Sequence, residues 1–179
     1  MKTMLVVLAA SLLTLMPVSL HAASAEEIDA RVNQTLRAFY RHSPAGKELA
    51  KQAVGVLVFP DVIKAGIGIG GEYGEGALRV GGITAAYYNV ASASVGFQLG
   101  VQVKSEVLLF MSQGALDSFR SSDGWEAGVD GSVALVTVGA GGQVDSNTVQ
   151  QPIIGFIFSN KGLMYNLSIE GSKITRIDR

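Results

Sequence analysis

The sequence predicts an α+β domain in which N-terminal amphipathic helices precede a glycine-rich, mainly antiparallel curved sheet of barrel-like or sandwich form. Three observations support this class. Apolar residues recur at helical spacing early in the chain, short alternating apolar runs fill the remainder, and tight glycine turns separate those runs. Parallel strands need crossovers of about a dozen residues, so short turns favour antiparallel pairing. Roughly eight to ten strands are expected.

Residues 1–25 have the pattern of an export signal that is cleaved from the mature protein. A positive start and a mainly apolar run over residues 4–16 precede small residues that fit cleavage before Glu26, or two or three residues earlier. As a helix, that run would span about 20 Å, which is short of a membrane core of about 30 Å. We therefore expect residues 26–179 to form a single exported domain, periplasmic in a Gram-negative host, with peripheral membrane association.

The composition excludes several classes of function. The chain has 179 residues and no cysteine, which excludes disulfides, thiolate metal sites and a cysteine nucleophile. Its 14 Lys and Arg residues balance 15 Asp and Glu residues, and this net charge of −1 disfavours a nucleic-acid binder. With 48% hydrophobic and 16% charged residues, the chain is expected to fold around a core. We expect no metal, no cofactor and no nucleic-acid partner.

Residues 26–41 are predicted to form an amphipathic helix, because apolar side chains recur every three or four residues. These side chains are Ile28, Val32, Leu36, Phe39 and Tyr40. Ser43 and Pro44 then supply the N-cap and the first residue of a second helix that ends at Gln52. His42 falls at the end of the first helix, where the helix dipole favours a cation.

Strands and one further helix are expected in the rest of the chain. The strand ranges are 54–59, 66–71, 83–90, 94–104, 106–111, 131–139, 152–159, 163–170 and 173–177. The first should end at Pro60, and in the fourth apolar residues alternate with small or polar ones, which predicts one apolar face. A short helix capped by Ser112 is expected over residues 113–120, and a polar loop over residues 145–151.

Motifs for catalysis are weak. Residues 66–71 match a G-x-G-x-x-G pattern, but two further glycines follow and oppose the helix that a dinucleotide site needs, so a strand is expected. Glu72 and Glu75 flank a glycine-rich segment that we interpret as a turn, and a second acidic group surrounds Trp125. That group is Asp123, Glu126 and Asp130. Solubility and turn formation explain both groups; a carboxylate-based hydrolase or a hard cation site is the alternative.

The first helix allows two interpretations. Its apolar stripe packs on the sheet, as most such stripes do, or it lies in a membrane interface with basic residues at the lipid headgroups. Between residues 31 and 51 the chain has five basic residues and one acidic residue, Glu48. At about 1 kcal/mol per basic residue, this charge supports weak binding to an anionic surface. The candidate membrane-binding set is Ile28, Val32, Leu36, Arg37, Phe39, Tyr40, Arg41, Lys47 and Lys51.

Residues 51–78 resemble the opening of the SYLF domain, a lipid-binding family related to yeast actin-patch proteins. The matching positions are Ala53, Gly55, Phe59, Pro60, Ala65, Gly66, Gly70, Gly71, Gly74, Gly76 and Leu78. Residues 95–100, 161–163 and 167–171 resemble later segments of that family, whereas residues 85–88 and 138–142 depart from it. The resemblance implies binding of anionic phospholipid, in part through the N-terminal amphipathic region, by an exported bacterial member.

Together these inferences predict an exported, non-enzymatic protein that binds anionic phospholipid or membrane surfaces. The alternative is a structural envelope protein that binds an unidentified protein partner or assembles with itself. In that case the first helix is only part of the core, and polar substitutions on its apolar face would unfold the protein. The third interpretation, a hydrolase that uses carboxylates near Trp125, has no visible acid–base constellation to support it.

Overall fold

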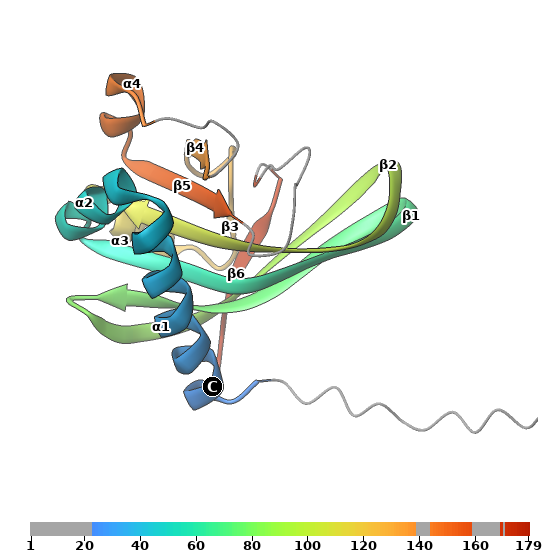
Figure 1. Cartoon of the computed structure of the whole chain (residues 1–179). Coiled ribbons are helices and arrows are strands. Elements are labelled where there is room, and N and C mark those ends of the chain that lie inside the picture. The colour runs from blue at the N-terminus through green and yellow to red at the C-terminus, as the bar shows by residue number, and fades with distance from the viewer. Residues whose placement is uncertain (1–22, 139–143, 159–168, 170) are drawn as a thin grey trace, which may run out of the picture.

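The computed structural model describes residues 23–138, 144–158, 169 and 171–179, with backbone alone at residues 67, 68 and 94–100 (Figure 1). The chain is α+β, and its N-terminal helices precede a curved sheet, as predicted. The helices are α1 (Ala25–His42), α2 (Pro44–Gln52), α3 (Gln113–Ser121) and α4 (Ser146–Val149). The strands are β1 (Gly55–Val80), β2 (Ile83–Phe110), β3 (Trp125–Glu126), β4 (Ala134–Thr137), β5 (Ile153–Phe158) and β6 (Lys173–Ile177).

The described strands form one mainly antiparallel sheet with the order β3-β6-β2-β5-β4, and β1 pairs with β2. β1 and β2 are 26 and 28 residues long, so each contains ranges that the sequence analysis separated. That merging is why the described part has fewer strands than expected. The β4–β5 pair is parallel, against the antiparallel expectation, because a long connection from Thr137 to Ile153 replaces a tight turn.

The β1–β2 hairpin turns at Gly81 and Gly82, as the sequence indicated. Both have positive φ, at 59° and 83°, which glycine adopts without strain. In Figure 1 the paired strands run out to one side, bend, and return over themselves. The bend brings two parts of β1 together, and a Cβ on Gly76 would clash with the Val58 carbonyl oxygen. Gly76 therefore permits this close backbone approach, which a side chain would block.

Two predictions about these strands are wrong. Pro60 does not end a strand; the register shifts between Phe59 and Val62, and β1 continues through this bulge. The apolar face expected for residues 94–104 is not found where side chains are described, because Val101 and Gln102 are both exposed and Val103 is half-buried. Val101 is 70% exposed and Lys104 only 3% exposed, because the bent hairpin turns Lys104 toward its interior.

One core lies between the layers of the bent hairpin and α3. Phe119 of α3 packs its ring 4.9 Å from both Tyr88 and Phe110 and 5.7 Å from Trp125, measured between ring centroids. These residues belong to one buried apolar cluster that also includes Leu57. The predicted helix over residues 113–120 is confirmed, and the Ser112 hydroxyl accepts a hydrogen bond from the Ala115 N–H as its N-cap.

A second core lies between α1, α2 and the opposite face of the sheet. The ring centroid of Phe39 lies 4.9 Å from that of Phe156 and 6.0 Å from that of Phe158. Ser24 and Glu27 form a capping box at the start of α1, a signal that the sequence analysis did not use. The predicted cap of α2 by Ser43 is confirmed, because its hydroxyl accepts from the Gly46 N–H. Both helices begin and end within one residue of their predicted bounds.

The polar stretch after β4 contains a short helix where a loop was expected. The Asp145 carboxylate accepts a hydrogen bond from the Thr148 N–H at 2.7 Å and so caps α4. The predicted strand over residues 163–170 falls largely outside the described residues. Among the described residues, no helix is long and apolar enough to cross a membrane.

Candidate functional site

The structure divides the nine candidate membrane-binding residues into a buried group and an exposed group. Ile28, Val32 and Phe39 are at most 2% exposed and pack on the sheet, so they are unavailable to lipid while α1 is docked. Core packing therefore uses the centre of the apolar stripe, and lipid contact by these three side chains would require α1 to leave the sheet. Leu36 and Tyr40 are half-buried beside this core.

The four basic residues of the candidate set are all exposed on α1 and α2, and we call them the basic surface. They are Arg37, Arg41, Lys47 and Lys51. Arg37 and Arg41 lie one helical turn apart on the solvent side of α1. The Lys51 ammonium pairs with Glu48 at 2.7 Å, which lowers the pKa of that carboxyl. Within the described part of the chain, no ion pair neutralises the other three basic side chains.

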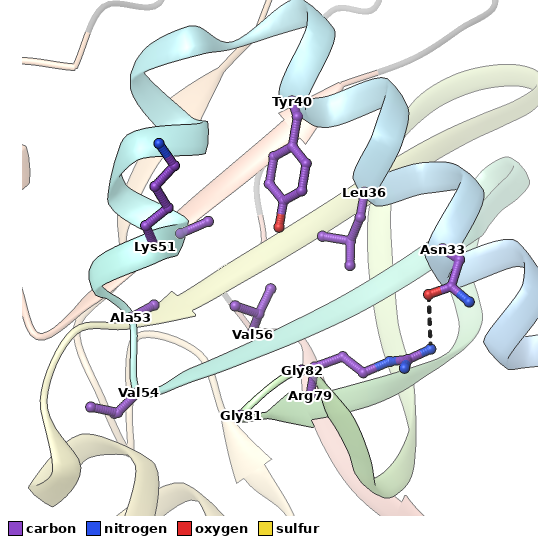
Figure 2. Close-up of a pocket in the computed structure, with 11 residues that line it drawn as sticks. Asn33, Leu36, Tyr40, Lys51, Ala53, Val54, Val56, Arg79, Gly81 and Gly82 are labelled. Carbon is purple, nitrogen blue, oxygen red and sulfur yellow. Dashed lines mark hydrogen bonds between the residues drawn. The ribbon is translucent and has the colours of Figure 1, made fainter.

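A cavity of about 290 Å³ lies beside the basic surface, between α1, α2 and the turn of the β1–β2 hairpin (Figure 2). We call it the Arg79 pocket. Among the described residues its lining contains two cations, Arg79 and Lys51, and no carboxylate, although Asp29 and Glu48 pair with these cations from outside the lining. Its other lining residues are Asn33, Leu36, Tyr40, Ala50, Ala53, Val54, Val56, Gly81 and Gly82. Three members of the candidate set, Leu36, Tyr40 and Lys51, therefore meet in this pocket.

Tyr40 presents its hydroxyl to the Arg79 pocket. Figure 2 shows the side chain descending from α1 toward Val56, with the oxygen at its inner end. The ring is held 5.6 Å from the ring of Phe39, measured between centroids. Burial raises the pKa of Tyr40 above its usual range, so the hydroxyl stays protonated at neutral pH. It is therefore able to donate a hydrogen bond to a ligand in the pocket.

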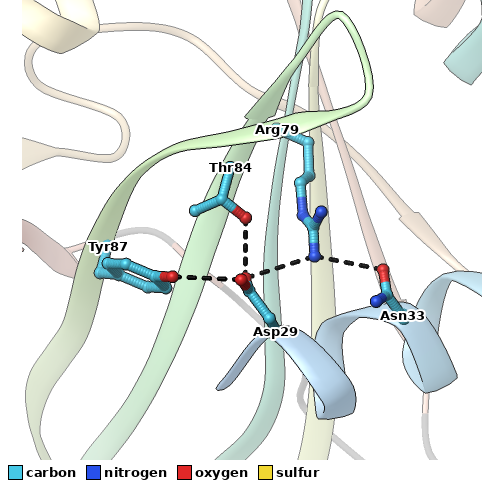
Figure 3. Close-up of polar contacts among 5 residues, drawn as sticks. All are labelled: Asp29, Asn33, Arg79, Thr84 and Tyr87. Carbon is cyan, nitrogen blue, oxygen red and sulfur yellow. Dashed lines mark hydrogen bonds and ion pairs between the residues drawn. The ribbon is translucent and has the colours of Figure 1, made fainter. Parts of the chain in front are cut away.

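Arg79 crosses from β1 to α1, where a polar cluster holds it (Figure 3). Its Nη2 donates to Asp29 Oδ1 at 3.3 Å and to Asn33 Oδ1 at 3.1 Å. Asp29 also accepts hydrogen bonds from the hydroxyls of Thr84 at 2.7 Å and Tyr87 at 3.1 Å. The Arg79 Nε is buried and has no hydrogen-bond partner among the described residues. The guanidinium is thus fixed in place with one buried donor unused.

Sequence reasoning did not find Arg79, Asp29 or Asn33. The one available signal is that Asp29 and Asn33 lie one turn apart, next to the apolar stripe of the helix. Their partner Arg79, on β1, is 50 residues from Asp29 and 46 residues from Asn33 in the sequence. Only the folded hairpin brings Arg79 to them.

A larger hollow of about 640 Å³ lies between the start of α1 and β1. Three carboxylates line it, those of Glu27, Asp61 and Glu75, together with a single cation, Arg31. Arg31 is already 3.8 Å from Asp61. This acidic lining disfavours an anionic ligand, so the Arg79 pocket is the better candidate for one.

The candidate carboxylates occupy structural positions. Glu72 and Glu75 lie within β1 rather than at the turn that the sequence analysis inferred. Glu75 accepts a hydrogen bond from the Tyr73 hydroxyl at 2.8 Å and pairs with Arg179. Near Trp125, the Asp130 carboxylate accepts a hydrogen bond from the Glu126 N–H at 2.7 Å. That contact stabilises the turn after β3, in agreement with the turn interpretation.

Inside the bent hairpin, four charged residues form what we call the buried ion chain. Lys64 lies 3.0 Å from Glu72, Glu72 lies 2.7 Å from Lys104, and Lys104 lies 3.0 Å from Glu106. Burial raises the pKa of Glu106, and Lys104 offsets only part of that effect. Burial lowers the pKa of Lys104, but the two carboxylates outweigh it and hold that pKa above its usual range.

His42 lies at the end of α1, as predicted. Its Nδ1–H donates to the Ala38 carbonyl oxygen at 2.7 Å, so the ring satisfies one of the last carbonyls of the helix. Among the described residues, no group of three or more His, Asp or Glu side chains is arranged to hold a metal ion.

The comparison with protein-family models gives one match. Residues 91–178 match Ysc84, the family described as "Las17-binding protein actin regulator". Residues 91–178 are thus similar to the Ysc84 family, which is the SYLF domain family. The resemblance noted from the sequence is therefore confirmed over this range. The Ysc84 match covers most of β2 and continues through β6, whereas α1, α2 and β1 precede it, so the basic surface and the Arg79 pocket lie outside it. No curated protein matches the chain.

Proposed function

We propose that the protein is an exported, non-enzymatic domain that binds anionic phospholipid surfaces through its basic surface. The observation that carries this proposal is the exposure of Arg37, Arg41 and Lys47 on two adjoining helices, with no carboxylate paired to them among the described residues. The family similarity supports it, because the SYLF resemblance implies lipid binding. The apolar side of α1 has no part in this model, since it forms the core.

Electrostatic attraction supplies the binding energy in this proposal. A basic residue near an anionic membrane contributes about 1 kcal/mol, and the field fades within a Debye length of about 8 Å at physiological salt. Binding should therefore prefer anionic vesicles and weaken as salt is added. An exposed helix surface, unlike a deep cavity, gives salt full access to these contacts.

The test is flotation of the purified protein with phosphatidylglycerol or phosphatidylcholine vesicles across a salt series. We expect wild-type protein to float with the anionic vesicles at low salt only. The Arg37→Glu/Arg41→Glu variant should bind at least about tenfold more weakly, since it replaces attraction by repulsion. The matched control, Arg120→Glu/Arg176→Glu, makes the same charge change at exposed positions on α3 and β6 and should float like wild type.

Two results would contradict the proposal. One is equal flotation of the wild type and the Arg37→Glu/Arg41→Glu variant. The other is an equal loss in the control, which would make net charge, and not this surface, the determinant. Circular dichroism of each variant must match the wild-type spectrum, because both substitutions lie on solvent-exposed positions and should leave the fold intact.

A second candidate function is binding to a protein partner or self-assembly in the envelope. It is favoured by large apolar side chains on the bent part of the hairpin, where Ile63, Ile69 and Val101 are 49%, 74% and 70% exposed. Sedimentation of the wild type and an Ile69→Ser/Val101→Ser variant tests it. A larger species that this variant converts to monomer would support assembly through the bend, whereas identical monomers would remove self-assembly.

Export and periplasmic location are part of the proposal. The sequence pattern of residues 1–25 supports them. Fractionation of a Gram-negative host should release the processed protein with the periplasm or the membranes. An unprocessed chain that stays in the cytoplasm would contradict this part of the proposal.

A further inference from the structure

We propose that the Arg79 pocket binds a phosphate ester group of headgroup size. A lipid headgroup and a soluble phosphate ester share this chemistry, and the lipid form of the inference rests on the proposed membrane function. The pocket lies against the basic surface, because Lys51 belongs to both. A headgroup engaged there would place its membrane next to the exposed arginines of α1.

The lining of the pocket matches an oxyanion. Arg79 and Lys51 contribute positive charge, and Tyr40 contributes a hydroxyl donor, while no lining residue is a carboxylate. Phosphate oxygens are strong acceptors that pair well with guanidinium and ammonium groups. Tyr40, like any tyrosine whose pKa is at or above the usual value, keeps its proton at neutral pH and is able to donate it in a hydrogen bond. Lys51 is already paired with Glu48, and Arg79 Nη2 with Asp29 and Asn33, so the donor that a ligand would newly satisfy is Arg79 Nε.

The protein holds the Arg79 side chain in place but leaves one of its hydrogen-bond donors without an acceptor among the described residues. Asp29 and Asn33 occupy Nη2, and they hold the guanidinium against α1. Nε remains buried with no acceptor among the described residues, a state that native proteins avoid unless water or a ligand completes it. A phosphate oxygen in the pocket would supply that acceptor. The rigid arrangement reduces the entropy lost when the ligand binds.

The size of the pocket limits the ligand. Its volume of about 290 Å³ lies at the lower limit of the roughly 300–1,000 Å³ that small-molecule sites occupy. It therefore accepts a phosphate with a glycerol-sized substituent and excludes acyl chains. Leu36 and Val56 give the ester carbons an apolar wall, while Gly81 and Gly82 lie at the hairpin turn without side chains to cover it. A lipid would thus leave its acyl chains outside, in the membrane.

The experiment measures binding of two soluble probes by calorimetry at constant ionic strength. These probes are sn-glycerol 3-phosphate and glycerophosphoglycerol, the deacylated headgroup of phosphatidylglycerol. We expect saturable binding with one site per chain. Tyr40→Phe removes only a hydroxyl and should weaken the affinity about tenfold, as expected for a hydrogen bond to a charged group. Arg79→Gln should abolish detectable binding. The control Tyr73→Phe removes a hydroxyl outside the pocket and should bind like wild type.

The arms of the experiment separate the two sources of phosphate and the two proposals. Binding of glycerophosphoglycerol together with a flotation defect in Tyr40→Phe identifies the lipid headgroup as the ligand. Binding of glycerol phosphate without any flotation identifies a soluble ester and leaves the pocket standing while the membrane proposal fails. The Arg37→Glu/Arg41→Glu variant should still bind the soluble probes, because neither residue lines the pocket.

Absence of saturable binding by both probes would overturn the pocket inference, even if the protein floats with vesicles. Equal affinity of wild type and Tyr40→Phe would also overturn it. Arg79→Gln breaks contacts to Asp29 and Asn33 and could unfold the protein; in that event Tyr40→Phe, whose ring still packs on Phe39, decides the matter.

Discussion

Replacing Lys104 by methionine should cost about 3–5 kcal/mol of unfolding free energy at pH 7. The Lys104 ammonium is 3% exposed and lies 2.7 Å from Glu72 and 3.0 Å from Glu106. Methionine keeps the apolar stem but leaves Glu106, which is 1% exposed, without this cation. Domains of this kind are stable by only about 5–15 kcal/mol, so the variant should unfold at much lower urea concentration.

The loss should depend on pH in a defined direction. Burial already raises the pKa of Glu106, and removing the Lys104 charge would raise it further. A carboxyl whose pKa is higher in the folded state than in the unfolded state binds its proton more tightly when folded. Ionisation of Glu106 therefore destabilises the folded state as pH rises through the folded-state pKa. This destabilisation is lost again as pH falls and the carboxyl is protonated. The deficit of Lys104→Met relative to wild type should be smaller at pH 5 than at pH 7.

Urea denaturation followed by circular dichroism at both pH values measures these free energies. Adding Glu106→Gln to Lys104→Met should recover most of the loss at pH 7, because the unpaired charge is gone. The control Lys64→Met, whose side chain is 16% exposed, keeps Lys104 between its carboxylates and should cost less than half as much. A loss below about 1 kcal/mol for Lys104→Met, or an equal loss with Glu106→Gln present, would refute this reasoning.

Three further predictions concern α1 and α2. Phe39→Ala should lower stability by about 3–5 kcal/mol in thermal melts, because the ring fills the second core; an unchanged melt with lost flotation would contradict core packing. Gly46→Ala should cost about 1–3 kcal/mol, since its Cβ would overlap the Phe39 ring, whereas Gly114→Ala meets open space and should not destabilise. Ser24→Ala should cost about 1 kcal/mol of unfolding free energy, because it removes the capping box of α1. If the exported protein keeps this capping box, its intact mass should correspond to an N-terminus at or before Ser24. A mass that corresponds to an N-terminus at Glu26 would contradict this.

Local signals in the sequence predicted the helices well because those signals are complete within a few residues. The Ser43 cap with Pro44 placed the start of α2, and the apolar stripe placed α1. The strand ends were predicted less well. Proline ends most central strands because it lacks an N–H donor. Among the described strands, however, β1 pairs with β2 alone, and the register shift around Pro60 is a bulge, where proline is tolerated.

Strand alternation predicted a period but not which face is buried. Along β2 the odd-numbered residues were expected inside, yet Val101 is exposed and Lys104 is buried. A change of one residue in register or one bulge exchanges the faces, and hydrophobicity normally selects the buried one. Here the interior of the bend holds a buried ion chain, so that criterion failed. Nothing in the local sequence states that Glu72 and Lys104 would meet.

The candidate site divides in the same way. The exposed positions of Arg37, Arg41 and Lys47 could be predicted from the sequence alone, because charged side chains normally remain at the surface without any particular partner. The Arg79 pocket could not, because it depends on contacts between α1 and a hairpin that folds back from far along the chain. The same folding uses the apolar stripe of α1 as core, so the membrane interpretation now rests on the exposed basic residues of that helix.

The energetics of the two proposed sites explain why both are needed for useful membrane affinity. The three basic residues that are unpaired among the described residues, at about 1 kcal/mol each, give about 3 kcal/mol, which corresponds to a Kd of several millimolar. Undocking α1 to add its apolar face would gain little, because transfer of Phe39 to lipid would expose the sheet residues that it now covers, such as Phe156. A headgroup in the Arg79 pocket adds contacts without undocking the helix. Tyr40→Phe should therefore weaken flotation on phosphatidylglycerol while leaving its salt dependence unchanged, because the basic surface alone sets the screened part of the affinity.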